Sequence, residues 1–171
     1  MTNMLRCLGT GLGIVMAAGL AVAQTPKAPQ TAPQRLKAQL DDINRKVLEM
    51  AKDFPADKYD YKLKPEMRSF RELIVHIASG NVYAGKAGKG DATAKWDEID
   101  AKTIKDKAAA VALYEKSVAD ADAGLAASPE GPKKNLEPFL SVIEHNAEHY
   151  GLLVGYYRAN GLVPPESRPK K

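Results

Sequence analysis

Apolar residues recur every three or four positions in four stretches of the chain, which is the spacing of an amphipathic α-helix. In the first stretch the apolar residues are separated by 4, 3, 4, 3 and 4 positions, and they are Leu36, Leu40, Ile43, Val47, Met50 and Phe54. This stripe predicts a helix of about five turns that ends before Pro55. No stretch keeps the alternation of apolar and polar residues that indicates a β-strand.

Two further helices follow in the middle of the chain. Ser69 and Glu72 have the spacing of a capping box, in which each side chain binds a free backbone N–H group, and the helix they open is expected to end near Gly85. The next helix is expected to open at Thr103 and to run to about Leu125. Both helices carry apolar residues at helical spacing, so both are expected to bury one face.

The last predicted helix covers about residues 136–159 and stops at Asn160-Gly161, a pair suited to a left-handed cap. Four long helices without a strand predict an all-α fold, a four-helix bundle. The connection over residues 85–101 is unusually long for a bundle. At about 3.3 Å per extended residue it could return along a neighbouring helix, which allows an up-down-down-up order with this segment as the crossover.

The beginning of the chain has the features of a targeting segment. Arg6 precedes an uncharged apolar run over residues 8–22 that ends in small residues, and this run is shorter than the roughly 20 residues that span a bilayer. We therefore expect a signal peptide over residues 1–23, a proline-rich spacer over 24–33 and one domain over 34–171. The mature protein is then exported, to the periplasm or the medium, with no transmembrane span; an uncleaved N-terminal anchor is the alternative.

Composition narrows the range of functions. The chain of 171 residues is 44% hydrophobic and 27% charged and has a net charge of +4, which is typical of a globular domain. Its basic residues alternate with acidic ones and form no stripe, so a nucleic-acid partner is not expected. The single cysteine, Cys7, excludes a disulfide framework and a cysteine-based zinc site. A homodimer formed through helix faces is compatible with the sequence, but no apolar stripe specifically predicts one.

The candidate chemistry lies in the only three histidines of the chain. His145 and His149 are four residues apart on the last helix, on the face that also holds Val142 and Tyr156, so both rings are expected to point toward the core. His76 lies beside the apolar stripe of the second helix. Three neutral imidazoles from two helices can hold a divalent metal ion and leave open positions for water or substrate. The alternative is that they are hydrogen-bonded packing residues.

Two other metal motifs fit less well. Di-iron bundles use Glu-x-x-His, and none of the three histidines has a glutamate three residues before it. Residues 145–149 also spell His-x-x-Glu-His, an inverted zinc-protease motif in which Glu148 is the general base. That motif needs a downstream carboxylate ligand, and only Glu166 in a proline-rich tail is available. We therefore interpret Glu148 as a flanking carboxylate and Glu144 as part of a solvated face.

Several segments together resemble a known family. They are Phe54-Pro55 with Lys58-Tyr59-Asp60-Tyr61, Pro65 with Met67-Arg68-Ser69-Phe70, residues 72–78, residues 143–151, and Asn160-Gly161-Leu162-Val163-Pro164-Pro165. In this order and spacing they resemble the DinB-like superfamily of metal-binding four-helix bundles over about residues 36–168. The resemblance implies an up-down-down-up bundle and a metal triad of His76, His145 and His149, with zinc or nickel as the expected ion.

The activity that the resemblance implies is less specific. Related families include thiol S-transferases and a thiol-dependent isomerase that use cytosolic low-molecular-weight thiols, and an exported protein departs from that setting. Two function classes follow. The first is a metal-dependent transferase or hydrolase acting on an unknown small molecule. The second is a metal-binding or interaction module of the cell envelope without turnover.

Overall fold

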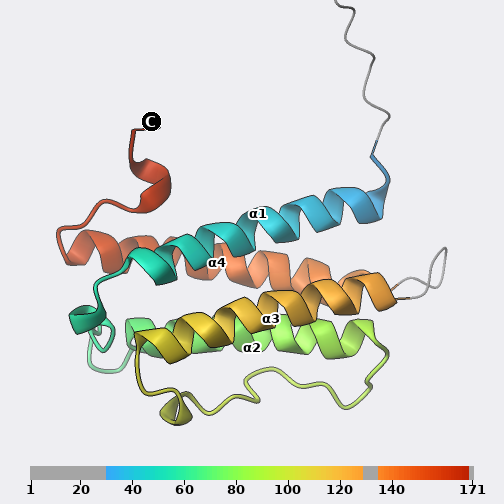
Figure 1. Cartoon of the computed structure of the whole chain (residues 1–171), viewed down its shortest axis with the longest axis horizontal. Helices are drawn as coiled ribbons and strands as arrows, with labels where there is room; N and C mark the ends of the chain where they lie inside the picture. Colours follow the sequence, from blue (N-terminus) through green and yellow to red (C-terminus); the bar gives the residue numbers. More distant parts are fainter. Residues whose placement is uncertain (1–29, 129–134, 170–171) are drawn as a thin grey trace, which may run out of the picture.

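The computed structural model describes residues 30–128 and 135–169, and within these ranges it contains four long α-helices and no strand. The helices are α1 (Ala32–Asp53), α2 (Phe70–Gly88), α3 (Lys107–Ala127) and α4 (Glu137–Ala159) (Figure 1). Three 3₁₀ turns, η1 (Ala56–Lys58), η2 (Ala101–Thr103) and η4 (Pro165–Ser167), lie in the connections and the tail. The prediction of an all-α four-helix bundle is confirmed for the described residues.

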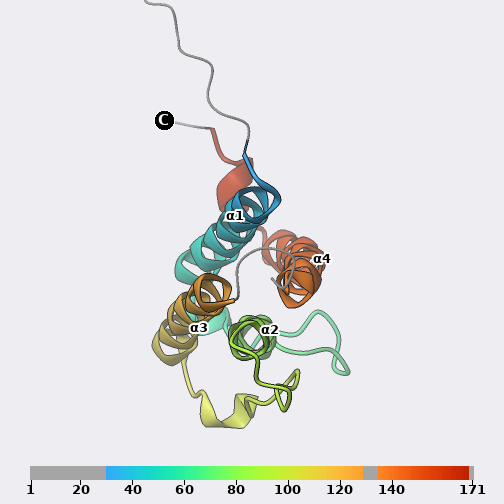
Figure 2. The same ribbon diagram turned by 90° about the vertical axis from the view of Figure 1, so that its right-hand side faces the viewer.

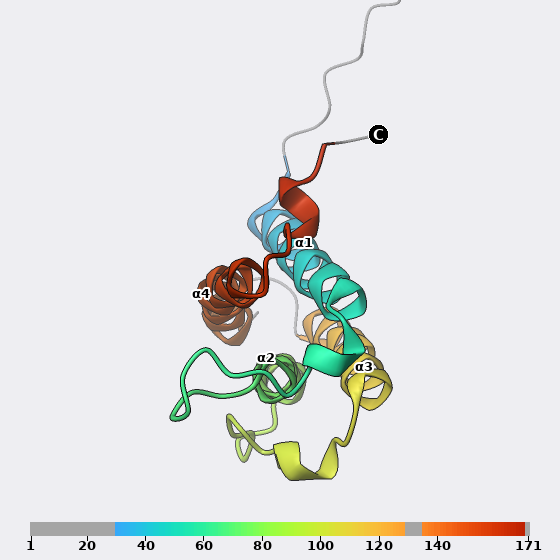
Figure 3. The ribbon, with the colours of Figure 1, turned by 90° about the vertical axis from the view of Figure 1, so that its left-hand side faces the viewer.

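The helices pack in a ring in which α2 lies between α3 and α4, and α1 closes the ring on the opposite side (Figures 2 and 3). Arg71 near the start of α2 donates to the carbonyl of Ile104 just before α3, and Gly88 at the other end of α2 lies against Gly124. These two pairs show that α2 and α3 run side by side in the same direction. The connection over residues 89–106 therefore returns along α2, on the side of α2 away from α1 (Figure 2).

The capping residues in the sequence mark where the helices begin more closely than the first residues of the apolar stripes do. The Ser69–Glu72 capping box opens α2 as predicted. In α1 the start is Ala32, inside the segment expected as a spacer, because Thr31 and Gln34 form a capping box and Pro33 is tolerated in the first turn. The expected start of α3 at Thr103 is wrong. Residues 101–103 form η2, and α3 begins at Lys107, where the Asp106 side chain accepts from the N–H of Ala109.

Glycines set the distance between α2 and α3. A Cβ atom on Gly85 would lie 2.5 Å from the carbonyl oxygen of Asp120, and one on Gly124 would lie 2.5 Å from the carbonyl oxygen of Gly85. The two backbones are therefore in direct contact. Gly85 was expected near the end of the second helix, but α2 continues to Gly88, because here the glycine serves close packing and not termination.

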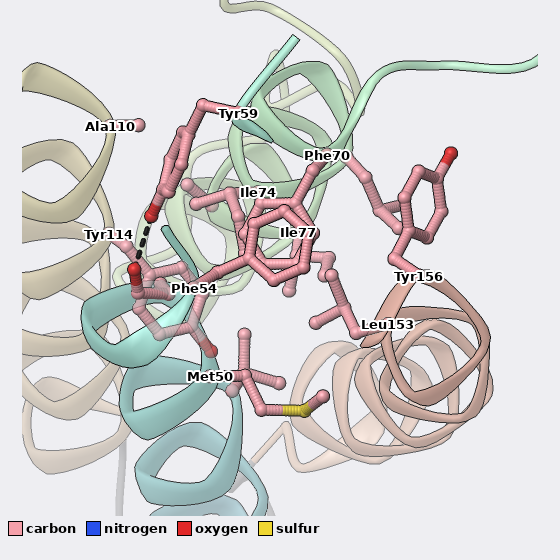
Figure 4. Close-up of a cluster of buried hydrophobic side chains, with 14 of the residues drawn as sticks. Met50, Phe54, Tyr59, Phe70, Ile74, Ile77, Ala110, Tyr114, Leu153 and Tyr156 are labelled. Carbon is pink, nitrogen blue, oxygen red and sulfur yellow. Dashed lines mark hydrogen bonds between the residues drawn. The ribbon is translucent and has the colours of Figure 1, made fainter. Parts of the chain in front are cut away.

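An aromatic core fills the end of the bundle where α1 ends and α2 begins (Figure 4). The rings of Phe54 and Phe70 stack with their centroids 3.8 Å apart, and Tyr157 of α4 packs on Phe54 at 5.0 Å. The Tyr157 hydroxyl donates to the carbonyl of Met50, which satisfies its only polar group inside the core. This cluster fixes the N-terminal part of α2 against α4, and that is the part that carries His76.

The last helix ends as the sequence predicted. Gly161 has a φ of +70°, its N–H donates to Arg158, and the N–H of Leu162 donates to Tyr157, which is the Schellman arrangement. None of the helices among the described residues is long and apolar enough to cross a membrane. The expected signal peptide and most of the expected spacer lie outside the described residues.

Candidate metal centre

The three histidines meet in the interface between α2 and α4. His145 and His149 lie one turn apart on α4, and their ring centroids are 4.4 Å apart. His76 of α2 faces both, with its Nε2 atom 3.0 Å from the Nε2 atom of His145 and 3.0 Å from that of His149. All three side chains are partly buried, and one ligand atom from each lies within 4.8 Å of the others.

A carboxylate from the α2–α3 connection holds the outer nitrogen of His76. Asp97 Oδ1 lies 2.5 Å from His76 Nδ1. Since a carboxylate only accepts, Nδ1 donates, and the Nε2 atom of a neutral His76 ring carries the lone pair. Asp97 reaches this position with a φ of +55°, the only positive φ of a non-glycine residue in the described part of the chain. Aspartate is among the few residues that tolerate this left-handed conformation.

A buried amide fixes the outer nitrogen of His145 in the same way. The fully buried Asn146 donates through Nδ2 to the side-chain oxygens of Asn44 and Asn81, at 3.0 and 3.1 Å. Its Oδ1 atom therefore faces His145 Nδ1 at 3.0 Å as an acceptor. His145 Nδ1 must donate, so the Nε2 lone pair of this ring also points at His76.

This amide belongs to a polar layer that crosses the bundle. Asn44 Oδ1 accepts from Asn81, Asn146 and the hydroxyl of Tyr114, and Asn81 also donates to the hydroxyl of Ser117. The layer takes at least one side chain from each of the four helices. A buried polar network of this kind specifies one arrangement of the helices, and here that arrangement sets the orientation of the His145 ring.

An indole covers one side of the centre. Trp96, next to Asp97 in the connection, lies 5.0 Å from the ring of His145 and stacks on Tyr83 of α2 at 4.6 Å. A Cβ atom on Gly80 would lie 2.9 Å from the Trp96 ring and 3.2 Å from His145 Nδ1. Glycine at this position of α2 therefore leaves the space that the indole and the imidazole occupy together.

The surroundings keep the histidines of α4 neutral. Burial, followed by the neighbouring imidazoles and the charge of Arg68, lowers the pKa of His149 to about 4. Burial also lowers the pKa of His145, against a smaller opposing effect of the hydrogen bond to Asn146. A neutral imidazole is the form that binds a metal ion, so these two rings are ready to ligate at neutral pH.

The donor set fits a metal ion. When the rings of His76 and His145 are both neutral, their Nδ1 atoms donate and their two Nε2 lone pairs face each other 3.0 Å apart. Such a pair is repulsive unless a cation lies between the two nitrogens. Nitrogens bound at about 2.0–2.1 Å to a tetrahedral zinc ion lie roughly 3.3 Å apart, close to the separation found here. Carboxylate and amide acceptors on the outer nitrogens are the usual partners of metal-binding histidines.

Comparison with known proteins agrees with this geometry. The family model of the DinB superfamily matches residues 39–153, which is more than half of the chain. The chain belongs to the DinB superfamily. The matched segment contains all three histidines and Asp97. A search of curated proteins gives no significant match.

The glutamates of the alternative motif take no part in the centre of this DinB protein. Glu144 and Glu148 are exposed, and Glu166 pairs with Arg45 of α1 at 2.7 Å. Among the described residues, the three histidines form the only group of histidine, cysteine and carboxylate side chains arranged to hold a metal ion.

Sequence reasoning missed the residues around the triad. Asp97 lies in a connection without periodicity, and neither spacing nor composition marks it as a neighbour of the histidines. One feature of the sequence could have drawn attention to Asn146, because it directly follows His145. An asparagine on a helix is either exposed or part of a buried hydrogen-bonded network.

Proposed function

We propose that the protein binds one divalent transition-metal ion, zinc or nickel, through the Nε2 atoms of His76, His145 and His149. The observation that carries this proposal is that the three Nε2 atoms converge, with those of His145 and His149 each 3.0 Å from that of His76. Asp97 and Asn146 orient the rings of His76 and His145 through their outer nitrogens. The lowered pKa values of His145 and His149 support the proposal, because the neutral imidazole is the form that binds a metal ion.

We further propose that this centre serves a metal-dependent transferase or hydrolase exported to the periplasm or the medium. A divalent ion with three protein ligands keeps open positions and lowers the pKa of a bound water or thiol. The protein's own residues hold and orient the imidazoles, and Trp96 covers one side of them. The signal-peptide pattern of residues 1–23 supports export.

A neighbouring cavity favours an enzyme over a metal-binding module without turnover. A polar hollow of about 430 Å³ has His76 and Asp97 in its wall. Its volume is in the range of sites for small molecules. Its position supports an enzyme more than its size does, because a larger hollow of about 700 Å³ lies elsewhere on the protein, whereas this one adjoins His76.

The proposal is tested by measuring the metal content and the metal-induced rise in Tm of the mature protein and of its His76→Ala variant. Protein purified from its native compartment is expected to contain one zinc or nickel ion per chain. Metal at a hundredfold excess over Kd is expected to stabilise the fold by about 2.7 kcal/mol, seen as a rise in Tm. His76→Ala should lose this shift, whereas the exposed control Glu144→Gln should keep it. A full shift in His76→Ala would contradict the three-histidine site.

A further inference from the structure

The cavity beside His76 lies between two connecting segments. Before α2, the cavity is lined by Lys62, Glu66, Met67 and Arg68. After α2, it is lined by Asp97 and by residues 99–102, and α2 itself contributes Glu72, Val75 and His76. Figures 2 and 3 show the first segment projecting past α2 on the side of α4, and the second running along the outer side of α2. A molecule in this cavity would contact His76 and Asp97, whereas His145 and His149 do not line it, and its other contacts would come mostly from the two segments.

Arg68 is a cationic side chain beside the centre, and its charge contributes to the lowered pKa of His149. Its backbone is anchored, because the hydroxyl of Tyr156 on α4 donates to its carbonyl. Its side chain is half exposed and makes one long contact, 3.7 Å from Nη2 to Asp97 Oδ2. That carboxylate is already engaged through its other oxygen with His76. The guanidinium therefore keeps most of its five donors available beside the ligand.

The acidic groups of the cavity are largely committed. Glu72 accepts from the N–H of Ser69 and pairs with Lys62 at 3.3 Å. Asp97 holds His76, and Asp100 accepts from the N–H of Lys102. These three carboxylates would therefore repel a bound acid less than unpaired carboxylates would. Glu66 is the fourth carboxylate of the cavity and the exception.

The ammonium group of Lys102 adds a second cation to this wall. Its side chain makes no hydrogen bond or ion pair with the described residues. Met67, Val75 and Ile99 supply apolar surface to the cavity. The cavity thus combines apolar surface with two cationic groups that are available to a ligand.

We propose that this cavity binds the anionic part of a small organic acid and that Arg68 is the residue that recognises it. The proposal rests on the proposed function, since the other end of the same molecule is expected to lie at the metal ion. A planar guanidinium binds a carboxylate or a phosphate-type group through two parallel N–H···O bonds, whereas an ammonium such as that of Lys102 adds one point charge.

The test uses full-length mature protein loaded with Co²⁺ and two small thiols. 3-Mercaptopropionate carries a carboxylate, and 3-mercaptopropionamide is its uncharged match. The sulfur of either thiol, bound to cobalt, gives a charge-transfer band whose titration yields Kd without any assay of turnover. The wild type is expected to bind the acid about tenfold more tightly than the amide, which is the size of one charge-assisted interaction.

Arg68→Gln should reduce this preference to within about twofold, and Arg68→Lys should retain part of it. The matched control is Lys64→Gln, which removes an exposed charge from the same segment outside the cavity and should leave the preference unchanged. Methylphosphonate, added as a competitor, shows whether phosphate-type acids share the site.

The outcomes separate the two proposals. A protein that binds no Co²⁺ contradicts the proposed function and this inference with it. Normal cobalt binding without any preference for the acid overturns the inference alone. A preference that survives in Arg68→Gln also overturns it, because the carboxylate would then be chelating the cobalt and not binding Arg68.

Discussion

The two interfaces that α2 makes with its neighbours are built on different principles. Against α3, glycines bring the backbones into contact, with Gly85 and Gly124 each leaving no room for a Cβ atom. Against α4, the helices are separated by imidazole rings, and Trp96 fills the outer side. The first interface is complete without any further group. The second brings three imidazole Nε2 atoms together, and under the proposed function a metal ion completes it.

This difference shows how one helix can serve both stability and chemistry. Contact with α3 and the aromatic core hold α2 in place, so His76 is positioned before any metal arrives. The ligands on α4 are oriented independently, through Asn146 and the polar layer. Changes at the α2–α3 interface should therefore alter folding, and changes around the histidines should alter metal affinity.

The largest effect on folding is expected from Gly85→Ala. The added methyl group would lie 2.5 Å from a backbone oxygen of α3, and overpacking of this kind costs about 2 kcal/mol even though alanine favours a helix. Chemical denaturation measures the change. Gly151→Ala is the control, because this exposed α4 glycine has no neighbouring atom within 4 Å, and it should stabilise by up to about 1 kcal/mol.

Metal affinity should be unchanged in Gly85→Ala once the protein is folded. A stable Gly85→Ala protein would contradict the backbone contact between α2 and α3. A folded variant with strongly weakened metal binding would show that the two interfaces are not independent.

Asp97→Asn should weaken metal binding by about tenfold, or about 1.4 kcal/mol. Asparagine also tolerates the φ of +55° and keeps an acceptor for His76 Nδ1, but it loses the negative charge that makes the ring a better donor. Competition with a chromophoric chelator measures Kd. Glu98→Gln, which removes the adjacent ion pair with Lys86, is the control, and equal losses in both variants would show that only loop anchoring matters.

Stability of the metal-free protein should fall as the pH decreases from about 6.5 to about 4. The pKa of His149 is lowered to about 4 in the folded state, so in this range the unfolded chain binds the proton more readily. The contribution is about 1 kcal/mol after discounting for solvent at this half-exposed ring. The difference in unfolding free energy between pH 7 and pH 4.5 should therefore be smaller in His149→Gln than in the wild type. An identical pH dependence would contradict the lowered pKa.

Much of the fold could be predicted because it depends on patterns of residues that are close together in the sequence. The apolar stripe of Leu36, Leu40 and Val47, the Ser69 capping box and the Gly161 cap each depend on residues a few positions apart. Gly85 was misread because a glycine that ends a helix and one that permits close packing look alike until the partner helix is known. Thr103 was misread because the aspartate three residues later is itself the cap.

The candidate site also has a part that the sequence predicts and a part that it does not. His145 and His149 are one helical turn apart, and the family resemblance added His76, so the three histidines were named from the sequence. Asp97 is separated from His76 by 21 positions and reaches it through a left-handed residue in an irregular segment. Such a contact depends on the path of the whole connection, and no local pattern predicts it.

X-ray absorption spectroscopy of the zinc-loaded protein tests the central claim most directly. The account predicts a first shell with three imidazole nitrogens at about 2.0–2.1 Å, together with the outer-shell signals of the ring carbons, and the remaining position held by an oxygen. A shell with two or fewer imidazole nitrogens would contradict the convergence of His76, His145 and His149 on one ion.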